Sequence, residues 1–248
     1  MNAGQFFLQD YFATRHLFGA GMQWPQIIEG YASTIDTVAW LILLLMFEFE
    51  TSLFSAEYLH NFWIKWAVNT LKIIAYSFIV YSLYGYIAKY IAMHTFELSA
   101  INNLCDQIGK QLVFMVSPDD FSIISKQNCA DLTNEDKLFR LPGTNVVADN
   151  SHLALVQNLS IVDVVNASNW ILIVIILQAD IWIQLRHQLD HTIVKIFRFI
   201  KPFLYSLLFG CAIYWGINGT FLDFWDAFLW ILAFAFIELN VFKWNSNN

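Results

Sequence analysis

Residues 40–53 read WLILLLMFEFETSL, and this stretch decides the class of fold. Seven apolar residues follow Trp40, and then Glu48 and Glu50 appear where an apolar span should still be running. A helix needs roughly 20 mostly apolar residues to cross the hydrocarbon of a bilayer. The stretch therefore predicts a membrane helix that carries two acidic side chains near one end.

The composition of the whole chain agrees with a membrane protein. Of its 248 residues, 58% are hydrophobic and only 13% are charged, and the mean hydropathy is +0.51. A soluble domain carries roughly 25% charged residues. The net charge of −7 argues against a nucleic-acid partner, which would need a basic face. Because the sequence contains no glycine-rich phosphate loop and no nucleophile elbow, we expect neither an enzyme nor a bound cofactor.

Hydropathy predicts five membrane spans, and lipid-facing backbone must satisfy its own hydrogen bonds, so each span should be a helix. The predicted fold is therefore an all-α integral membrane protein in contact with the lipid bilayer. The five expected spans are residues 34–55, 68–93, 165–185, 199–217 and 224–243.

These spans divide the chain into five segments. Residues 1–33 are amphipathic and predict either an interfacial helix or a cap packed on the bundle. Residues 34–93 and 165–217 form two helical hairpins, and residues 218–248 form the fifth span with its tail. Residues 94–164 are rich in turn signals, so we expect a small loop cap with a few short helices and no substantial core of its own.

The basic residues predict the orientation. Residues 186–201 contain Arg186, Lys195, Arg198 and Lys201, and short basic loops stay in the cytoplasm. Five spans then place the N-terminus and residues 94–164 on the exoplasmic side and the C-terminus in the cytoplasm. We expect a bacterial inner membrane. Cys105 and Cys129 both fall in the exoplasmic segment, where an oxidising compartment favours a disulfide over two free thiols.

An internal repeat accounts for the acidic residues of the opening stretch. Residues 36–50, DTVAWLILLLMFEFE, align with residues 166–180, NASNWILIVIILQAD, and with residues 226–240, DAFLWILAFAFIELN. Lys72 and Lys201 also align between the two hairpins. The pattern predicts a hairpin repeated in parallel orientation, followed by a half repeat. The alternative is that membrane helices commonly carry Trp at one end and polar residues at the other.

The repeat predicts a layer of polar side chains in the inner half of the membrane. The residue eight positions after each Trp lies about 12 Å further along its helix and therefore deeper in the membrane. We expect the ion pairs Glu50–Lys72 and Asp180–Lys201, because a charge inside the bilayer needs a partner. The acids left without a lysine, with their neutral counterparts, form the predicted ion or proton site: Glu48, Glu238, Gln178 and Asn240. The alternative is that charge pairs only fix the helix register.

Two weaker candidates complete the set. His187 and His191 have a spacing that can bind zinc, but no third strong ligand is near in the sequence, so no metal site is predicted. Polar side chains of the second span predict either a polar path or helix packing with an aromatic belt: Tyr81, Tyr84, Tyr86 and Tyr90, with Ser77 and Ser82.

Two functions follow from these features. The first is a channel or transporter that moves a cation or proton through the carboxylate layer, and such a small chain would need to form a homo-oligomer. The second is an accessory or assembly subunit of a larger membrane complex, with aromatic helix faces that pack on other chains.

Overall fold

The computed structural model describes residues 2–18, 23–48, 62–101, 103–133, 137–185 and 191–246. For residues 47–48, 178, 180–185, 191–198 and 237–246 it describes the backbone alone. The chain divides into two compact units, Met1–Ser160 and Ile161–Asn248.

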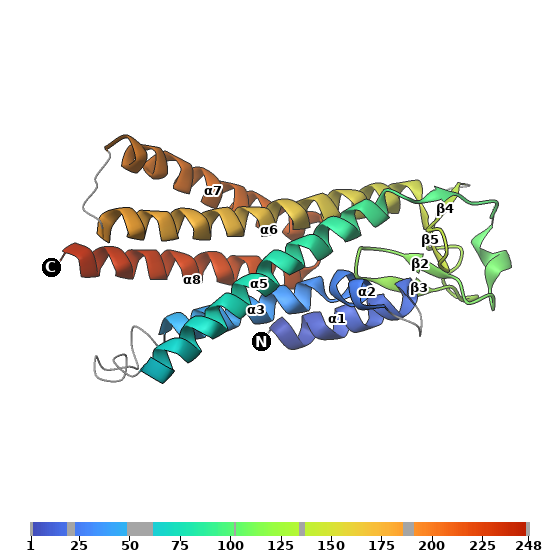
Figure 1. The fold of residues 1–248 in the computed structure, drawn as a ribbon. Coiled ribbons are helices and arrows are strands. Elements are labelled where there is room, and N and C mark those ends of the chain that lie inside the picture. The colour runs from blue at the N-terminus through green and yellow to red at the C-terminus, as the bar shows by residue number, and fades with distance from the viewer. Residues whose placement is uncertain are drawn as a thin grey trace. The chain divides into compact units, whose positions relative to one another are not determined.

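The first unit begins with four helices (Figure 1): α1 Asn2–Leu17, α2 Trp24–Gly30, α3 Ala32–Glu48 and α5 Phe62–Met93. Helices α3 and α5 form a hairpin, and α1 packs against α3 with Phe6 and Ala13 buried. Helices α1 and α2 thus pack on the α3–α5 hairpin, and whether they lie at the membrane interface stays a prediction. The axis bends by 75° between α2 and α3.

One stripe of α5 faces its neighbours. Its buried residues recur at intervals of three, four and seven: Val68, Ala75, Ile79, Ser82, Gly85, Lys89 and Met93. Such spacing keeps side chains on one face of a helix. Gly85 marks the closest approach, because an added Cβ would lie 2.7 Å from the Ile28 carbonyl oxygen and 2.9 Å from the Ala32 Cβ. The bend between α2 and α3 therefore packs directly against this stripe of α5.

Beyond the end of α5 the chain forms a sheet rather than the expected loops (Figure 1). The strands are β1 Glu97–Leu98, β2 Val113–Met115, β3 Phe121–Ile123, β4 Leu138–Arg140 and β5 Val146–Asp149, with a short 3-10 helix, η2 Leu104–Gln107. Their order is β1-β4-β5-β2-β3. β2 and β5 are parallel, and the other neighbours are antiparallel. We call residues 94–149 the sheet cap.

The sheet cap has buried apolar side chains on both faces, contrary to the expectation that it holds no substantial core. Alternate residues of a strand point to opposite faces. Val113 and Met115 of β2 join a cluster that includes Met93 and Val156, whereas Phe114 between them joins Leu104 and Cys129. The strands are only two to four residues long, yet each supplies side chains to these clusters or pairs with a strand that does.

Helix α6, Asn150–Leu185, begins fifteen residues before the predicted third span. The Asp149 carboxylate accepts a hydrogen bond from the His152 backbone N–H at 2.8 Å, which caps the first turn. Leu153 and Val156 then pack into the core of the sheet cap. The helix therefore begins inside the segment 94–164 that was predicted to be a loop cap, and its first turns pack against the sheet.

The second unit holds the rest of α6, together with α7 His191–Asn218 and α8 Phe221–Ser246. Helices α7 and α8 pack together as a hairpin. A reciprocal cap starts α8: the Thr220 hydroxyl donates to the Asp223 carboxylate at 2.7 Å, and the Asp223 N–H donates back to that hydroxyl at 3.3 Å.

Within the described residues, three helical segments are long and apolar enough to cross a membrane: Phe62–Met93, Asn150–Leu177 and Phe199–Asn218. The bent pair Trp24–Gly30 and Ala32–Met46 would be a fourth. The chain is therefore mostly helical with apolar helices of membrane-spanning length. The fifth predicted span falls on α8, whose side chains are described only as far as Phe236, so the count of five stays a prediction.

Candidate functional site

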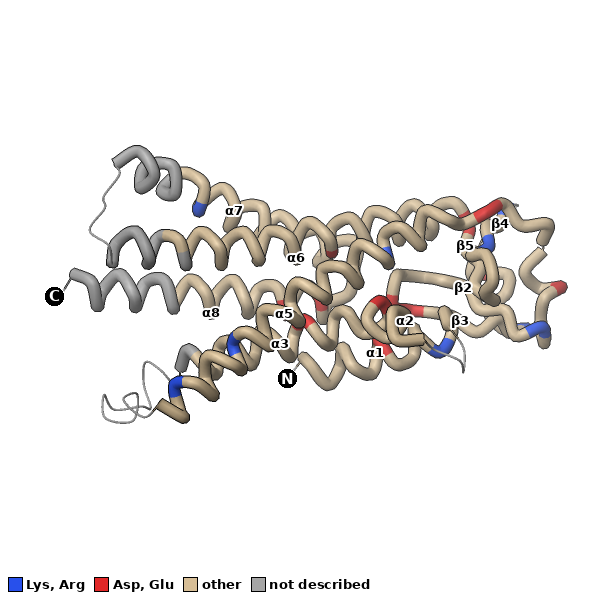
Figure 2. Tube along the Cα trace, in the orientation of Figure 1, with Lys and Arg blue, Asp and Glu red and all other residues tan. Residues whose placement is uncertain are grey.

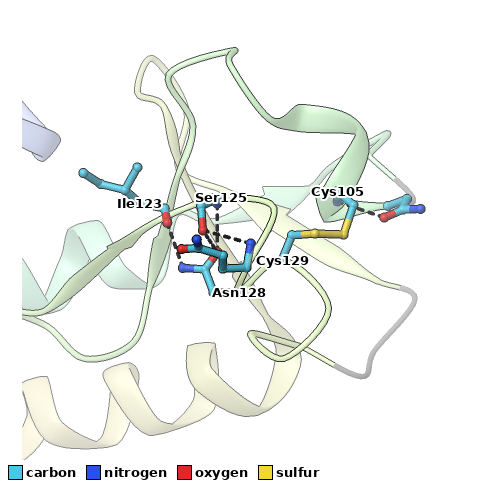
Figure 3. The surroundings of a disulfide bond; sticks show 7 residues. Cys105, Ile123, Ser125, Asn128 and Cys129 are labelled. Atoms are coloured by element: carbon cyan, nitrogen blue, oxygen red, sulfur yellow. Dashed lines mark hydrogen bonds between the residues drawn. A yellow bond between two sulfur atoms is a disulfide. The ribbon is translucent and has the colours of Figure 1, made fainter.

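The predicted disulfide is confirmed. Cys105 of η2 and Cys129 are bonded, with their Cα atoms 5.1 Å apart (Figure 3). Asn128 shapes the turn before Cys129, because its Oδ1 accepts hydrogen bonds from the Ser125 N–H at 2.8 Å and the Ser125 hydroxyl at 3.0 Å. The bridge fastens η2 to the segment that follows β3, on the face of the sheet that carries Phe114.

The predicted carboxylate layer lies outside the described side chains. Glu50 and His187 fall outside the described residues altogether. The backbone alone is described for Glu48, Gln178, Asp180, His191, Glu238 and Asn240. The lysines expected to pair with them, Lys72 on α5 and Lys201 on α7, are half-buried. Both predicted ion pairs and the predicted ion site therefore stay predictions.

A buried carboxylate that the sequence did not indicate lies between α1 and α3. Asp10 is 3% exposed, and its Oδ2 accepts hydrogen bonds from the Thr34 hydroxyl at 2.6 Å and the Thr34 N–H at 2.9 Å. The pKa of the Asp10 carboxyl is raised to about 7, first by burial and then by the nearby Asp119 charge. The Thr34 hydrogen bonds and the Lys89 charge lower it only in part. Asp10 therefore changes charge near neutral pH.

A lysine of α5 near this acid pairs with the sheet cap. The Lys89 ammonium contacts the Asp119 carboxylate at 2.6 Å, and its side chain is 9% exposed. Asp119 lies in the turn between β2 and β3, so the pair fastens the sheet cap to the end of α5. Figure 2 shows acidic positions gathered around α1 and α2, next to this end of α5.

A second polar contact lies further along the α3–α5 hairpin. Asp36 Oδ1 accepts a hydrogen bond from Trp40 Nε1 at 3.1 Å. The hydroxyl of the fully buried Ser82 lies 3.3 Å from the same oxygen, and its shortest acceptor is the Phe78 carbonyl oxygen of its own helix at 2.8 Å. Ser82 precedes Lys89 by seven residues on the buried stripe of α5, which is about 10 Å along the helix. We call Lys89, Ser82 and Asp36 the polar seam of this hairpin.

The second unit has polar contacts of its own. Trp215 Nε1 of α7 donates to Asp163 Oδ1 of α6 at 3.2 Å, and Asn169 Nδ2 donates to the Leu204 carbonyl oxygen at 2.8 Å. The contact between Trp40 and Asp36 has no equivalent at Asn166, whose Oδ1 accepts no hydrogen bond. The local contacts therefore differ between the aligned helices, and the repeat stays a prediction.

The sequence held a signal for part of this site. Ser82 and Lys89 occupy the stripe that also carries Val68, Ala75 and Met93, and polar residues at buried heptad-like positions indicate an interior role. Ser77, the other serine considered, is exposed, and its hydroxyl donates to the Ile73 carbonyl oxygen of its own helix. No pattern linked Asp10 or Asp119 to this stripe, because they lie 79 residues before and 30 residues after Lys89.

Compared with protein-family models, with curated proteins and with solved structures, the chain matches none of them.

Proposed function

We propose that this membrane protein moves a proton or a small cation along the polar seam between α3 and α5. The observation that carries the proposal is the burial of Ser82 beside Asp36 inside an apolar helical hairpin, with the buried Lys89 about 10 Å further along α5 at the foot of the sheet cap. Charged groups at membrane depth cost roughly 2.5–3.5 kcal/mol each on insertion scales, and they mark ion or proton pathways by default.

The seam extends toward the predicted carboxylate layer. Lys72 lies on α5 ten residues before Ser82, about 15 Å further along the helix, and it is half-buried. Glu48 ends α3 near the same level, by the repeat pattern. We propose that Asp10, Lys89 and Asp119 form the entrance of the path, that Asp36 and Ser82 form its middle, and that Glu48 and Glu50 form its inner end. Glu238, Gln178 and Asn240 would supply the corresponding positions of the other helices.

The proposed orientation places the sheet cap on the exoplasmic side of an inner membrane. The Cys105–Cys129 bridge supports it, since such bonds persist in oxidising compartments. The basic residues 186–201 support it from the other end. Labelling of intact cells with an impermeant thiol reagent, before and after reduction, tests the placement. Cysteines that stay protected after reduction would contradict it.

Flux measurements in liposomes test the seam itself. Asp36→Asn keeps an oxygen that accepts from Trp40 and Ser82 but removes the charge, so the fold should persist while flux falls. Ser82→Ala should also lower flux. Ser77→Ala is the matched control, because Ser77 is an exposed serine of the same helix that bonds only to its own backbone in the described contacts. Equal flux in all of these variants and the wild type would refute conduction along the seam.

A second candidate function, an accessory subunit of a larger complex, has one observation in its favour. An apolar groove of about 700 Å³ runs along α5 beside Pro25 and is lined by Phe78, Tyr81 and Tyr84 among others. Such a groove fits the side chains of a partner helix. Purification from native membranes separates the two functions: a subunit brings other chains with it and supports no flux alone, whereas a transporter purifies as an assembly of itself.

A further inference from the structure

A cleft of about 730 Å³ opens beside one edge of the sheet cap. β1 is the edge strand here, because its neighbour in the sheet is β4 on one side and no strand pairs with it on the other in the described sheet. The continuous stretch 97–101 lines the cleft, and η2 contributes Asp106 and Gln107. The cleft therefore follows a stretch of chain that begins with an unpaired strand edge.

The backbone of β1 has hydrogen-bonding groups that β4 does not use. The Ser99 N–H donates to the Leu138 carbonyl oxygen of β4 at 2.7 Å. Residues of an antiparallel strand bond to their neighbour alternately, so the N–H and C=O of Leu98 point away from β4. Leu98 is 66% exposed, and its backbone makes no hydrogen bond to other described residues on that side. β1 therefore offers a donor and an acceptor to a further strand.

The opposite edge of the sheet differs, because its own chain covers it. The edge strand there is β3, and the Asn128 side-chain amide donates to the Ile123 carbonyl oxygen at 2.9 Å. Proteins commonly block exposed strand edges in such ways, since an open edge pairs with other chains. Among the described residues, β1 has no equivalent cover, so the free edge and the cleft occur together at β1.

The charges of the cleft indicate which kind of segment fits it. Glu97 and Asp106 line the cleft, and neither makes a hydrogen bond or ion pair with the described residues. Arg140, the basic residue of the described lining, instead donates to the Thr144 carbonyl oxygen at 2.9 Å and to Asn145 Oδ1 at 3.2 Å. The whole sheet cap carries eight Asp or Glu against four Lys or Arg. Charge complementarity therefore favours a basic partner.

We propose that an extended, basic peptide segment of another protein adds to β1 as a sixth strand of the sheet cap. Its backbone would bond to Leu98, and a Lys or Arg side chain would lie beside Glu97 and Asp106. Strand addition of this kind takes its affinity from the main-chain hydrogen bonds and its specificity from the side chains. Binding here does not depend on conduction along the polar seam, so the two proposals fail separately.

The test uses three peptide probes and the purified full chain in nanodiscs of zwitterionic lipid, with empty nanodiscs as the blank. The first probe is acetyl-Lys-Val-Lys-Val-Lys-amide, and the second has Glu in place of each Lys. The third is the first with its three central amides N-methylated, which keeps the charge and removes the backbone donors. Titration calorimetry should show saturable binding of the first probe, and binding roughly tenfold or more weaker for the other two.

A proline variant tests the strand edge. Leu98→Pro removes the outward N–H and leaves the bonds between β1 and β4 in place, because proline is tolerated in an edge strand whose N–H faces solvent. It should weaken binding of the first probe roughly tenfold or more. Ile123→Pro makes the same change at an exposed position of β3, on the opposite edge, and should bind as the wild type does.

A charge variant provides a second route if Leu98→Pro fails to fold. Glu97→Gln combined with Asp106→Asn should weaken binding of the first probe, whereas Asp120→Asn combined with Asp131→Asn removes two exposed acids outside the cleft lining and should not. Three results would overturn the proposal. They are no saturable binding of the first probe, equal binding of the three probes, and a wild type that forms a dimer which Leu98→Pro disperses, since a second copy would then occupy the edge.

Discussion

Asp10 gives the sharpest prediction, since its effect on stability has the opposite sign to that of an ordinary surface acid. Its pKa is about 7 in the folded protein against an ordinary value of 3.8. At pH values below about 4 the Asp10 carboxyl is protonated in both the folded and the unfolded state, so it adds no pH dependence to the free energy of unfolding. Between about pH 4 and pH 7 the folded state keeps the proton and the unfolded state loses it, so stability falls as pH rises. Above pH 7 the loss is complete.

The magnitude follows from the two pKa values. They differ by about three, and each pH unit is worth about 1.4 kcal/mol, so ionised Asp10 costs the folded state about 4 kcal/mol. Asp10→Asn removes this cost while keeping an oxygen that accepts both Thr34 hydrogen bonds. The variant should match the wild type near pH 4, apart from a pH-independent difference, and exceed it by up to about 4 kcal/mol at pH 8.

Denaturant unfolding in detergent, followed by tryptophan fluorescence at pH 4, 6 and 8, measures how the free energy of unfolding of the wild type and of Asp10→Asn changes with pH. Asp120→Asn changes an exposed acid in the same turn as Asp119 and serves as the control, which should follow the wild type. The reasoning is refuted if the difference between Asp10→Asn and the wild type stays constant across this pH range, or if it favours the wild type more at pH 8 than at pH 4.

Three further perturbations test the packing of the same unit by denaturant unfolding. Asp119→Asn deprives the buried Lys89 of its carboxylate and should cost about 3 kcal/mol, most of which the double variant with Lys89→Met should recover; equal losses in the single and double variants would contradict a coupled pair. Gly85→Ala should cost about 1–3 kcal/mol because its Cβ would lie 2.7 Å from the Ile28 carbonyl oxygen, whereas Gly210→Ala, with nothing within 4 Å, should be neutral or stabilising. Cys105→Ser opens a bridge between residues 24 positions apart and should destabilise the sheet cap by about 3.5 kcal/mol; unchanged unfolding would show that the bridge adds nothing.

The parts of the fold that the sequence predicted are those set by local patterns. Apolar runs of membrane length predicted α5, α6 and α7, because a helix in lipid closes all its hydrogen bonds within itself. The bridge between Cys105 and Cys129 was predictable because both cysteines fall in one polar segment, away from the spans. In both cases the deciding residues lie close together in the chain.

The sheet cap could not be predicted in the same way. Its strands contain two to four residues, too few to show an alternating pattern against a background of turns. Its central parallel pair joins Val113 to Val146 and Phe114 to Val147, and no local signal fixes such a register. Long-range partners decide whether these apolar runs become strands, so the turn-rich sequence predicted loops.

The candidate site could not be predicted either, because its residues also lie far apart in the sequence. Asp10, Thr34 and Lys89 come from α1, α3 and α5, and each alone is an ordinary polar residue of an apolar chain. The fold buries Asp10, and the turn after β2 brings the Asp119 carboxylate to Lys89. The ion pairs predicted for Lys72 and Lys201 were different, because they followed from the alignment of the two helical hairpins in the internal repeat.

The position of the polar seam supports a functional role for its residues rather than a role in helix packing alone. The α3–α5 hairpin already packs closely through Ala75 and Gly85, small residues that let helices approach without polar groups. An alanine in place of Ser82 and a leucine in place of Lys89 would keep the stripe on the same face and remove the cost of desolvation. Instead, α5 carries Ser82 and Lys89, which contact Asp36 of α3 and Asp119 of the sheet cap, and the buried Asp10 of α1 has a pKa of about 7. A buried acid that exchanges a proton near neutral pH, with charged groups close to it, is typical of functional sites, and it supports the proposal of a path for protons or cations.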